Sequence, residues 1–201
     1  GTEAIYPVTI VDVKQEDGAL IVTGLDRPVR SRIDYVDGTT ITARFTSPLP
    51  DVIRVQLTHW KGRRERQPAF DLDYGPGNPG VSIGSDENRV WLRAGSLAVE
   101  TANVGGKWGI AFRRDGRPLT GSEPKAVALL KQDGRTYLRE QLSLAVGETI
   151  YGLGERFGPL VKNGQPIDMW NEDGGTNSEY AYKNIPFYLS TKEFFALVRK
   201  H

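Results

Sequence analysis

Thr-Ile-Thr-Ala-Arg-Phe, residues 40–45, alternates polar and apolar side chains one by one. Successive side chains of an extended strand point to opposite faces, so Ile41, Ala43 and Phe45 share one face and the polar residues share the other. An amphipathic helix would instead repeat its apolar residues every three to four positions. The stretch therefore predicts a β-strand that is buried on one side.

The same period of two recurs along the chain. Trp91 falls in one such run, and we expect it to fill the core. Because the apolar faces of many short strands must cover each other, the pattern predicts an all-β fold, an antiparallel β-sandwich with little helix. The other clear runs contain Ile53, Val55 and Leu57, then Trp108, Ile110 and Phe112, then Leu138, Leu142 and Leu144.

Gly-containing pairs mark the turns between these strands. A type I′ hairpin turn needs positive φ, which glycine adopts without steric cost. The Pro- and Gly-rich residues 63–80 predict a long surface excursion instead. Tight hairpins are predicted at the Asp-Gly pairs of residues 17–18, 37–38, 115–116 and 133–134, and at the Gly-Gly pair of residues 105–106.

Composition limits what the chain binds. Its 26 basic and 25 acidic side chains leave a net charge of +1, which gives no electrostatic basis for binding nucleic acid or an anionic membrane. The absence of cysteine excludes disulfides and thiolate sites, and the only two histidines, His59 and His201, exclude a His-rich metal centre. No run approaches the roughly 20 apolar residues of a membrane span. We expect no cofactor, no metal, and a cytoplasmic location unless a signal peptide has been removed.

The sequence allows two secondary structures for residues 190–201, a helix or part of a hairpin. Ser190 and Glu193 have the spacing of a capping box before an apolar run, which predicts a short terminal helix. Residues 187–189 and 196–198 instead predict the two strands of a hairpin. The hairpin is the favoured interpretation.

The loop 163–177 is rich in Asn, Asp and Gly around Trp170. Aromatic faces stack on sugar rings, and Asn and Asp side chains hydrogen-bond hydroxyl groups. The pattern by itself fits better a Gly-rich connection whose Asp and Asn side chains cap their own turns. Both interpretations stay open at this point.

The spacing of residues near this loop argues against other chemistry. The glycines of residues 152–158 do not have the spacing of a nucleotide-binding fingerprint. The carboxylates of residues 168–173 are neighbours in one loop, whereas an acid and base must flank a scissile bond from opposite sides. Glu155 and Arg156 are predicted to form an ion pair that fixes the loop.

Three motifs occur in order in this part of the chain. They read Tyr-Gly-Leu-Gly-Glu-Arg-Phe at residues 151–157, Trp-Asn-Glu-Asp-Gly-Gly-Thr at residues 170–176 and Ala-Tyr-Lys-Asn-Ile-Pro-Phe-Tyr at residues 181–188. The set closely resembles the N-terminal domain of glycoside hydrolase family 31, and its last two motifs look most like the bacterial α-xylosidases of that family. The resemblance implies a galactose-mutarotase-like β-sandwich over residues 1–189 that packs on a (β/α)₈ barrel.

The resemblance also implies where the chemistry lies. In the family both catalytic aspartates belong to the barrel, and neither of their motifs is in this chain, so we expect the chain to be inactive alone and to contain no catalytic residue. Its expected role is to brace the barrel and to supply a sugar-binding loop. Substrate binding is carried over to Asp173, with Trp170, Asn171 and Thr176 as its neighbours in the loop. The implied partners are the barrel and an α-xyloside or α-glucoside oligosaccharide bound through the parent enzyme. A homo-oligomer is expected of the isolated domain, because the apolar surface that the barrel normally covers would be exposed.

Other interpretations remain open. Glu193, Phe195 and Arg199 stand where the family has Gly, Gly and Asn, so the terminal segment departs from the family pattern. A stand-alone carbohydrate-binding module would use the same loop, and an engineered scaffold would explain the unusual end. An aldose mutarotase is suggested by the fold only, since neither histidine lies in a suitable context.

Overall fold

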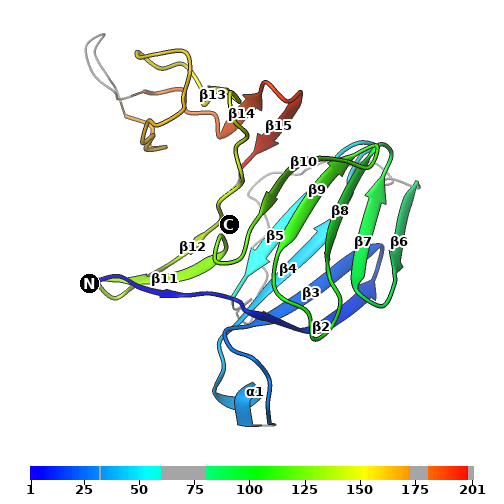
Figure 1. Cartoon of the computed structure of the whole chain (residues 1–201). Helices are drawn as coiled ribbons and strands as arrows, with labels where there is room; N and C mark the ends of the chain where they lie inside the picture. The colour runs from blue at the N-terminus through cyan, green and yellow to red at the C-terminus, as the bar shows by residue number, and fades with distance from the viewer. Residues whose placement is uncertain (32, 60–79, 173–180, 199–201) are drawn as a thin grey trace. The chain divides into compact units, whose positions relative to one another are not determined.

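The structure, a computed structural model, describes residues 1–31, 33–59, 80–172 and 181–198. The chain divides into two compact units, Gly1–Ser143 and Leu144–His201 (Figure 1). The single sandwich domain expected over residues 1–189 stays a prediction. The expected excursion at residues 63–80 lies outside the described residues except at Gly80.

Two antiparallel sheets face each other in the first unit, and their inner faces form one core cluster. A smaller sheet lies beside them and also sends residues into the core. This arrangement confirms the predicted all-β antiparallel sandwich. The first sheet has the order β2 (Thr9–Glu16), β3 (Ala19–Leu25), β4 (Thr40–Thr46), β5 (Arg54–Thr58); the second has the order β10 (Arg117–Ser122), β9 (Ile110–Arg114), β8 (Leu97–Ala102), β7 (Arg89–Ala94), β6 (Val81–Ser85); the third has the order β1 (Glu3–Ile5), β11 (Ala128–Gln132), β12 (Arg135–Arg139).

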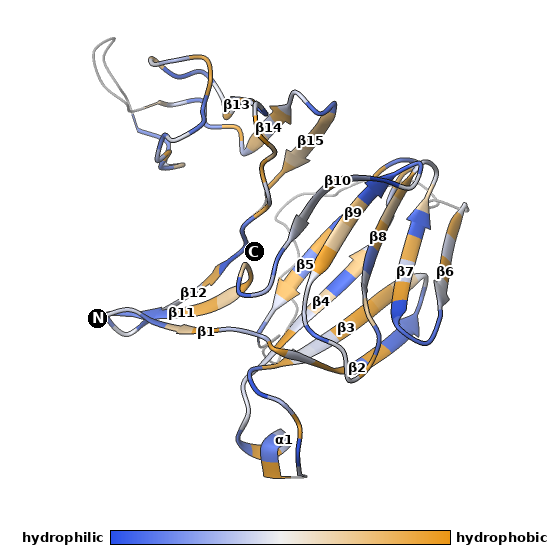
Figure 2. Ribbon diagram, viewed as in Figure 1, coloured by the Kyte–Doolittle hydropathy of each residue, from blue (hydrophilic) through white to orange (hydrophobic). Residues whose placement is uncertain are grey.

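The core follows the predicted period of two. Ile41, Ala43 and Phe45 of β4 are each at most 1% exposed, while the polar residues between them stay partly exposed. Figure 2 shows the same alternation of hydrophobic and hydrophilic residues along strands of both large sheets. Trp108 is 2% exposed and belongs to the core cluster, as predicted.

Trp91 does not fill the core, so its predicted role is wrong. Val90 and Leu92, the residues on either side of it, point into the core, and strand alternation therefore sends Trp91 to the opposite face of the sheet. There it is paired across the sheet with Gly84, where an added Cβ would lie 2.7 Å from the indole ring. The guanidinium of Arg93 lies 5.6 Å from the centroid of the same ring.

Three of the four Asp-Gly pairs form the predicted hairpin turns, with positive φ at both residues: 17–18, 115–116 and 133–134. The prediction is wrong at residues 37–38. Asp37 ends the short helix α1 (Ile33–Asp37), which lies in the connection from β3 to β4. Gly38 packs against Leu25 so closely that an added Cβ would overlap that side chain.

The predicted strand through Leu142 and Leu144 is also wrong. β12 ends at Arg139, and Leu138 and Leu144 are exposed. Within the described residues, no helix is long and apolar enough to cross a membrane.

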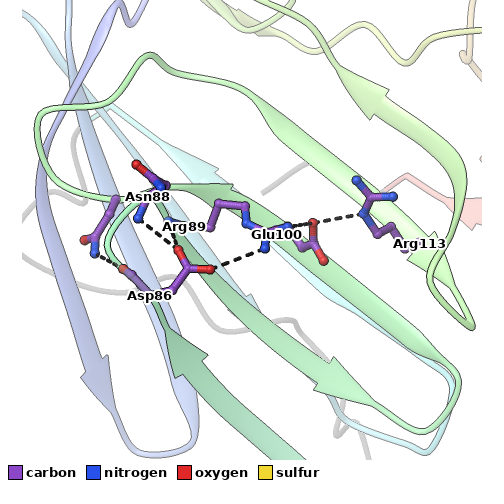
Figure 3. A network of polar contacts seen from close by, with 6 residues as sticks. Asp86, Asn88, Arg89, Glu100 and Arg113 are labelled. Carbon is purple, nitrogen blue, oxygen red and sulfur yellow. Dashed lines mark hydrogen bonds and ion pairs between the residues drawn. The ribbon is translucent and has the colours of Figure 1, made fainter.

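A polar network occupies the outer face of the second sheet (Figure 3). Glu100 lies between two arginines, with its Oε2 2.9 Å from Nε of Arg113 and 3.5 Å from Nη1 of Arg89. Asp86 accepts hydrogen bonds from the backbone N–H groups of Asn88 and Arg89, at 2.9 and 2.7 Å. The network thus joins β7, β8 and β9 on the face away from the core.

In the described residues of the second unit there is one three-stranded antiparallel sheet, β13 (Ile150–Gly152), β14 (Phe187–Ser190) and β15 (Phe194–Leu197). β14 and β15 form the favoured hairpin, with Phe187 opposite Leu197. The helical alternative for this segment is wrong, because Thr191–Glu193 form the turn and Glu193 has a φ of 60°.

Candidate functional site

The loop that follows β13 is anchored to that strand by Asn163. The backbone N–H of Ile150 donates to Oδ1 of Asn163 at 2.8 Å, and Nδ2 of Asn163 donates to the carbonyl oxygen of Glu148 at 2.8 Å. Glu148 is itself only 6% exposed, and its carboxylate accepts from Ser190 Oγ in β14. The start of the loop is therefore tied both to β13 and to the hairpin.

The turn after β13 lies against residues 183–187. The N–H of Leu153 donates to the carbonyl oxygen of Phe187 at 2.8 Å, and the N–H of Glu155 donates to that of Lys183 at 3.1 Å. Gly154 has a φ of 92°, and an added Cβ there would overlap the Lys183 carbonyl oxygen. A glycine is thus required both by the backbone angle and by the close approach of the two segments.

Glu155 and Arg156 each contact the 181–184 segment, whereas the predicted ion pair between the two stays a prediction. Nζ of Lys183 lies 3.0 Å from Oε1 of Glu155, and this hydrogen bond, followed by the charge attraction, raises the pKa of Lys183. Arg156 donates through Nη2 to Oδ1 of Asn184.

Asn184 is the centre of the contacts at the base of the loop. Its Nδ2 lies 2.8 Å from the carbonyl oxygen of Trp170, 2.9 Å from Oδ1 of Asn171 and 2.7 Å from the carbonyl oxygen of Ala181. Arg156 adds a bond from Nη2 to the carbonyl oxygen of Asp168 at 2.6 Å. Residues 168–171 and 181–184 are therefore held together by two side chains.

The predicted sugar-binding residues divide into two groups. Trp170 has 72% of its surface exposed, so its indole is accessible. Asn171 is bonded to Asn184 and forms an isolated bridge with Ala181. Asp173 and Thr176 lie outside the described residues, and the binding roles of all four residues stay predictions.

Sequence reasoning did not find the role of Asn184. The residue lies inside one of the three motifs, but nothing in its neighbours along the chain points to Arg156 or Trp170. Among the residues that the structure describes, no group of three or more His, Asp or Glu side chains is placed to hold a metal ion.

Comparison with known proteins identifies the family. Residues 42–198 match the family described as the glycosyl hydrolase 31 N-terminal galactose mutarotase-like domain. The chain belongs to this family. The three motifs at residues 151–157, 170–176 and 181–188 all lie inside the matched range, so the loop and its base are part of the glycosyl hydrolase 31 domain.

Two curated relatives of this glycosyl hydrolase 31 domain are similar over most of the chain. An α-xylosidase of Emericella nidulans is 37% identical over 194 residues, which covers 87% of this chain and 25% of that protein. The α-xylosidase XylQ of Lactiplantibacillus pentosus is 38% identical over 194 residues, which covers 96% of this chain and 25% of that protein. The chain thus spans about a quarter of the length of these relatives.

Solved structures show the same fold at low sequence identity. The cycloalternan-forming enzyme of Listeria monocytogenes superposes with a TM-score of 0.71 at 15% identity, over 96% of this chain and 17% of that one. The family 31 dextranase of Flavobacterium johnsoniae superposes with a TM-score of 0.70 at 16% identity, over 94% of this chain and 22% of that one. These likenesses support the galactose-mutarotase-like fold of the glycosyl hydrolase 31 domain.

Proposed function

We propose that this chain is the N-terminal domain of a retaining α-glycosidase of the α-xylosidase type. In this proposal it braces a catalytic barrel and supplies a sugar-binding loop, residues 163–177, to the active site. The family match and the two relatives named α-xylosidase support the enzyme class. Retaining hydrolysis needs two carboxyl groups about 5 Å apart around the anomeric carbon, which we place in the barrel.

The observation that carries the sugar-binding role is the anchored base of the loop. Asn184 and Arg156 hold residues 168–171 against residues 181–184, directly before Asp173 in the chain. A binding carboxylate needs such a base, because a hydrogen bond to a hydroxyl depends on the position of the oxygen within a few tenths of an ångström. Trp170, exposed at the same place, offers an aromatic face for a sugar ring.

The bracing role is supported by one face of the sheet β13–β14–β15. Leu189 pairs with Phe195, and Phe187 pairs with Leu197, so these four side chains lie on the same face. Leu189, Phe195 and Leu197 are 47%, 58% and 67% exposed. A contiguous exposed apolar face of this kind marks an interaction surface, and we assign it to the contact with the rest of the parent enzyme.

Replacing Asp173 in the full-length parent enzyme tests the sugar-binding role. A charged hydrogen bond contributes about 1.5–3 kcal/mol, so Asp173→Ala should lower kcat/KM for an aryl α-xyloside about 10- to 100-fold. The melting temperature should hardly change. Asp168→Ala is the matched control in the same loop, since Asp168 meets Arg156 through its backbone carbonyl. Unchanged kinetics of Asp173→Ala together with a large fall in melting temperature would make Asp173 a turn cap.

The isolated chain tests whether hydrolysis and tight sugar binding require the barrel. It should hydrolyse no aryl α-xyloside or α-glucoside, and it should bind sugars weakly, since it holds only half of the pocket. Its apolar face should bind a hydrophobic dye or drive dimerisation, and Phe195→Asp should reduce either effect. Tight binding of xylose-containing oligosaccharides by the isolated chain would instead indicate a stand-alone carbohydrate-binding module.

A further inference from the structure

Two side chains at the base of the loop, Arg156 and Asn184, connect residues 168–171 to residues 181–184. We propose that they are positioning residues, which promote sugar binding by fixing the backbone next to Asp173 and do not touch the sugar. This inference rests on the proposed function, because it requires Asp173 to bind substrate.

The side-chain amide of Asn184 is held in one orientation by partners of opposite kinds. Its Oδ1 faces the guanidinium of Arg156, which only donates hydrogen bonds. Its Nδ2 faces the carbonyl oxygens of Trp170 and Ala181, which only accept. Turning the amide over would place its NH2 group against the guanidinium and its oxygen against the two carbonyl oxygens, and such mismatched polar contacts are costly. The cluster therefore works as a unit with a single satisfied arrangement.

Arg156 connects a third segment to the same cluster. Its Nε donates to the carbonyl oxygen of Leu153 at 3.2 Å, and its Nη2 donates to that of Asp168 at 2.6 Å. A guanidinium carries its donors in a rigid planar fork, so it can hold two carbonyl groups and an amide oxygen in fixed relative positions. Lysine at this position would keep the charge and lose the fork.

The cluster ends one residue before Asp173. The N–H of Glu172 donates to the carbonyl oxygen of Ala181 at 3.2 Å, which joins the described residues on either side of residues 173–180. The cluster thus holds the backbone up to Glu172. Since a displacement of about 1 Å in a binding group can cost about 100-fold in rate, we expect residues that hold the neighbouring backbone to affect substrate binding without contacting the substrate.

Asn184→Asp in the full-length parent enzyme is the direct test. The substitution keeps the size of the side chain and the acceptor for Arg156, but it turns an oxygen toward the carbonyl groups of Trp170 and Ala181. We expect kcat/KM for an aryl α-xyloside to fall about 10- to 100-fold. In the Asp173→Ala background the same substitution should change kcat/KM by less than about 3-fold, because the group that it positions is gone.

Two further variants separate positioning from folding. Arg156→Lys should lower kcat/KM by less than Asn184→Asp does. Its effect should likewise shrink in the Asp173→Ala background. Lys183→Gln is the matched control: it removes the exposed pair with Glu155 next to the cluster, and kcat/KM should stay within about 2-fold of the unsubstituted enzyme. In the isolated chain, Asn184→Asp should speed hydrogen exchange of the Glu172 amide and leave the first unit unchanged.

The possible outcomes distinguish the two proposals. If Asp173→Ala lowers kcat/KM but Asn184→Asp has no effect, the positioning inference is wrong and the proposed function stands. The positioning inference is also wrong if the loss of kcat/KM in the double variant combines the full losses of Asp173→Ala and Asn184→Asp. If Asp173→Ala has no effect, the sugar-binding role fails and the inference fails with it. Unchanged exchange at Glu172 would show that Asn184 does not fix the loop base.

Discussion

The two compact units of the chain are held together in different ways. All of the buried hydrophobic residues that the structure describes, except Ala181, lie in the first unit. The second unit exposes large apolar side chains such as Trp170, Phe195 and Leu197. Its loops are held instead by hydrogen bonds from side chains such as Asn163 and Asn184.

The difference shows which unit is self-sufficient. Burial of apolar surface contributes about 25 cal/mol per Å², whereas a typical hydrogen bond contributes a net of about 1 kcal/mol. The first unit therefore has its own source of stability in the core between its sheets. The second unit is specified in detail by polar contacts but gains little from burial within itself, which agrees with the proposed role of a domain that is covered by a barrel.

The largest contrast should come from removing one phenylalanine in each unit. Phe45 has none of its surface exposed, so Phe45→Ala should cost about 3–5 kcal/mol of unfolding free energy in the isolated chain. Phe195 is 58% exposed, and Phe195→Ala should cost less than about 1 kcal/mol. Urea unfolding of both variants measures the difference. Equal losses would mean that the second unit has a core of its own.

Two glycines give the next contrast. Gly154 and Gly116 have φ values of 92° and 78°, but an added Cβ overlaps the Lys183 carbonyl oxygen at Gly154 and meets nothing within 4 Å at Gly116. Gly116→Ala should cost about 1–2 kcal/mol from backbone strain. Gly154→Ala should cost about 2–4 kcal/mol, because overlap adds to the strain. Hydrogen exchange at Leu153 and Glu155 should rise in the second variant alone, and similar exchange in both would argue against the close approach.

The next contrast between the two units is the dependence of folding stability on pH in the acid range. Asp51 accepts hydrogen bonds from Oγ and the backbone N–H of Ser96, at 2.7 and 2.6 Å, and these bonds lower the pKa of Asp51. A carboxyl group whose pKa is lower in the folded chain stabilises it above the unfolded pKa of about 3.9, and the contribution is lost as pH falls through the folded value. Asp51→Asn should therefore destabilise the chain near neutral pH and weaken the loss of stability below pH of about 4.

The pair of Lys183 and Glu155 in the second unit provides the control for this experiment. The pKa of Lys183 is raised, so the contribution of its charge is lost as pH rises through the folded value. Lys183→Gln should change the acid limb less than Asp51→Asn does, because both side chains of the pair are exposed and water screens them. Denaturant unfolding at a series of pH values measures both variants, and an equally flattened acid limb for Lys183→Gln would contradict the assignment to Asp51.

The sequence predicted the first unit better than the second, for a physical reason. The alternation at residues 40–45 reflects burial of every second residue, so a local pattern reports a non-local core. The hairpin prediction at the Asp-Gly pair of residues 37–38 was wrong because the same dipeptide can also end a helix. The surrounding chain decides which of these two structures forms. The prediction for Trp91 was wrong because an alternating run does not by itself tell which of its two faces is buried, and here Val90 and Leu92 take the core face.

The site was predictable only in part. The motifs located the loop, and the exposure of Trp170 and the place of Asn171 could then be described. The contacts of Arg156 and Asn184 could not be predicted, because these residues lie 28 positions apart and side-chain hydrogen bonds leave no periodic pattern in a sequence. Asp173 and Thr176 remain predictions that rest on the family resemblance.

The smallest contrast concerns surface charge. Glu100 is shared by Arg113 and Arg89 on the outer face of a sheet (Figure 3). Its side chain is only 14% exposed. The pair of Lys183 and Glu155 has side chains that are 56% and 66% exposed. Exposed pairs contribute between about zero and 1 kcal/mol because water screens them and their long side chains lose freedom. The shared carboxylate should lie at the top of that range.

Glu100→Gln should therefore cost about 1 kcal/mol in unfolding free energy, and Lys183→Gln should cost clearly less. Glutamine keeps the shape of glutamate and one acceptor oxygen, so Glu100→Gln removes mainly the charge. Salt shortens the screening length to about 3 Å at 1 M, so the loss for Glu100→Gln should shrink when unfolding is repeated at that salt concentration. A loss for Glu100→Gln that did not change with salt would indicate lost hydrogen bonding, and equal losses for the two variants would remove this difference between the units.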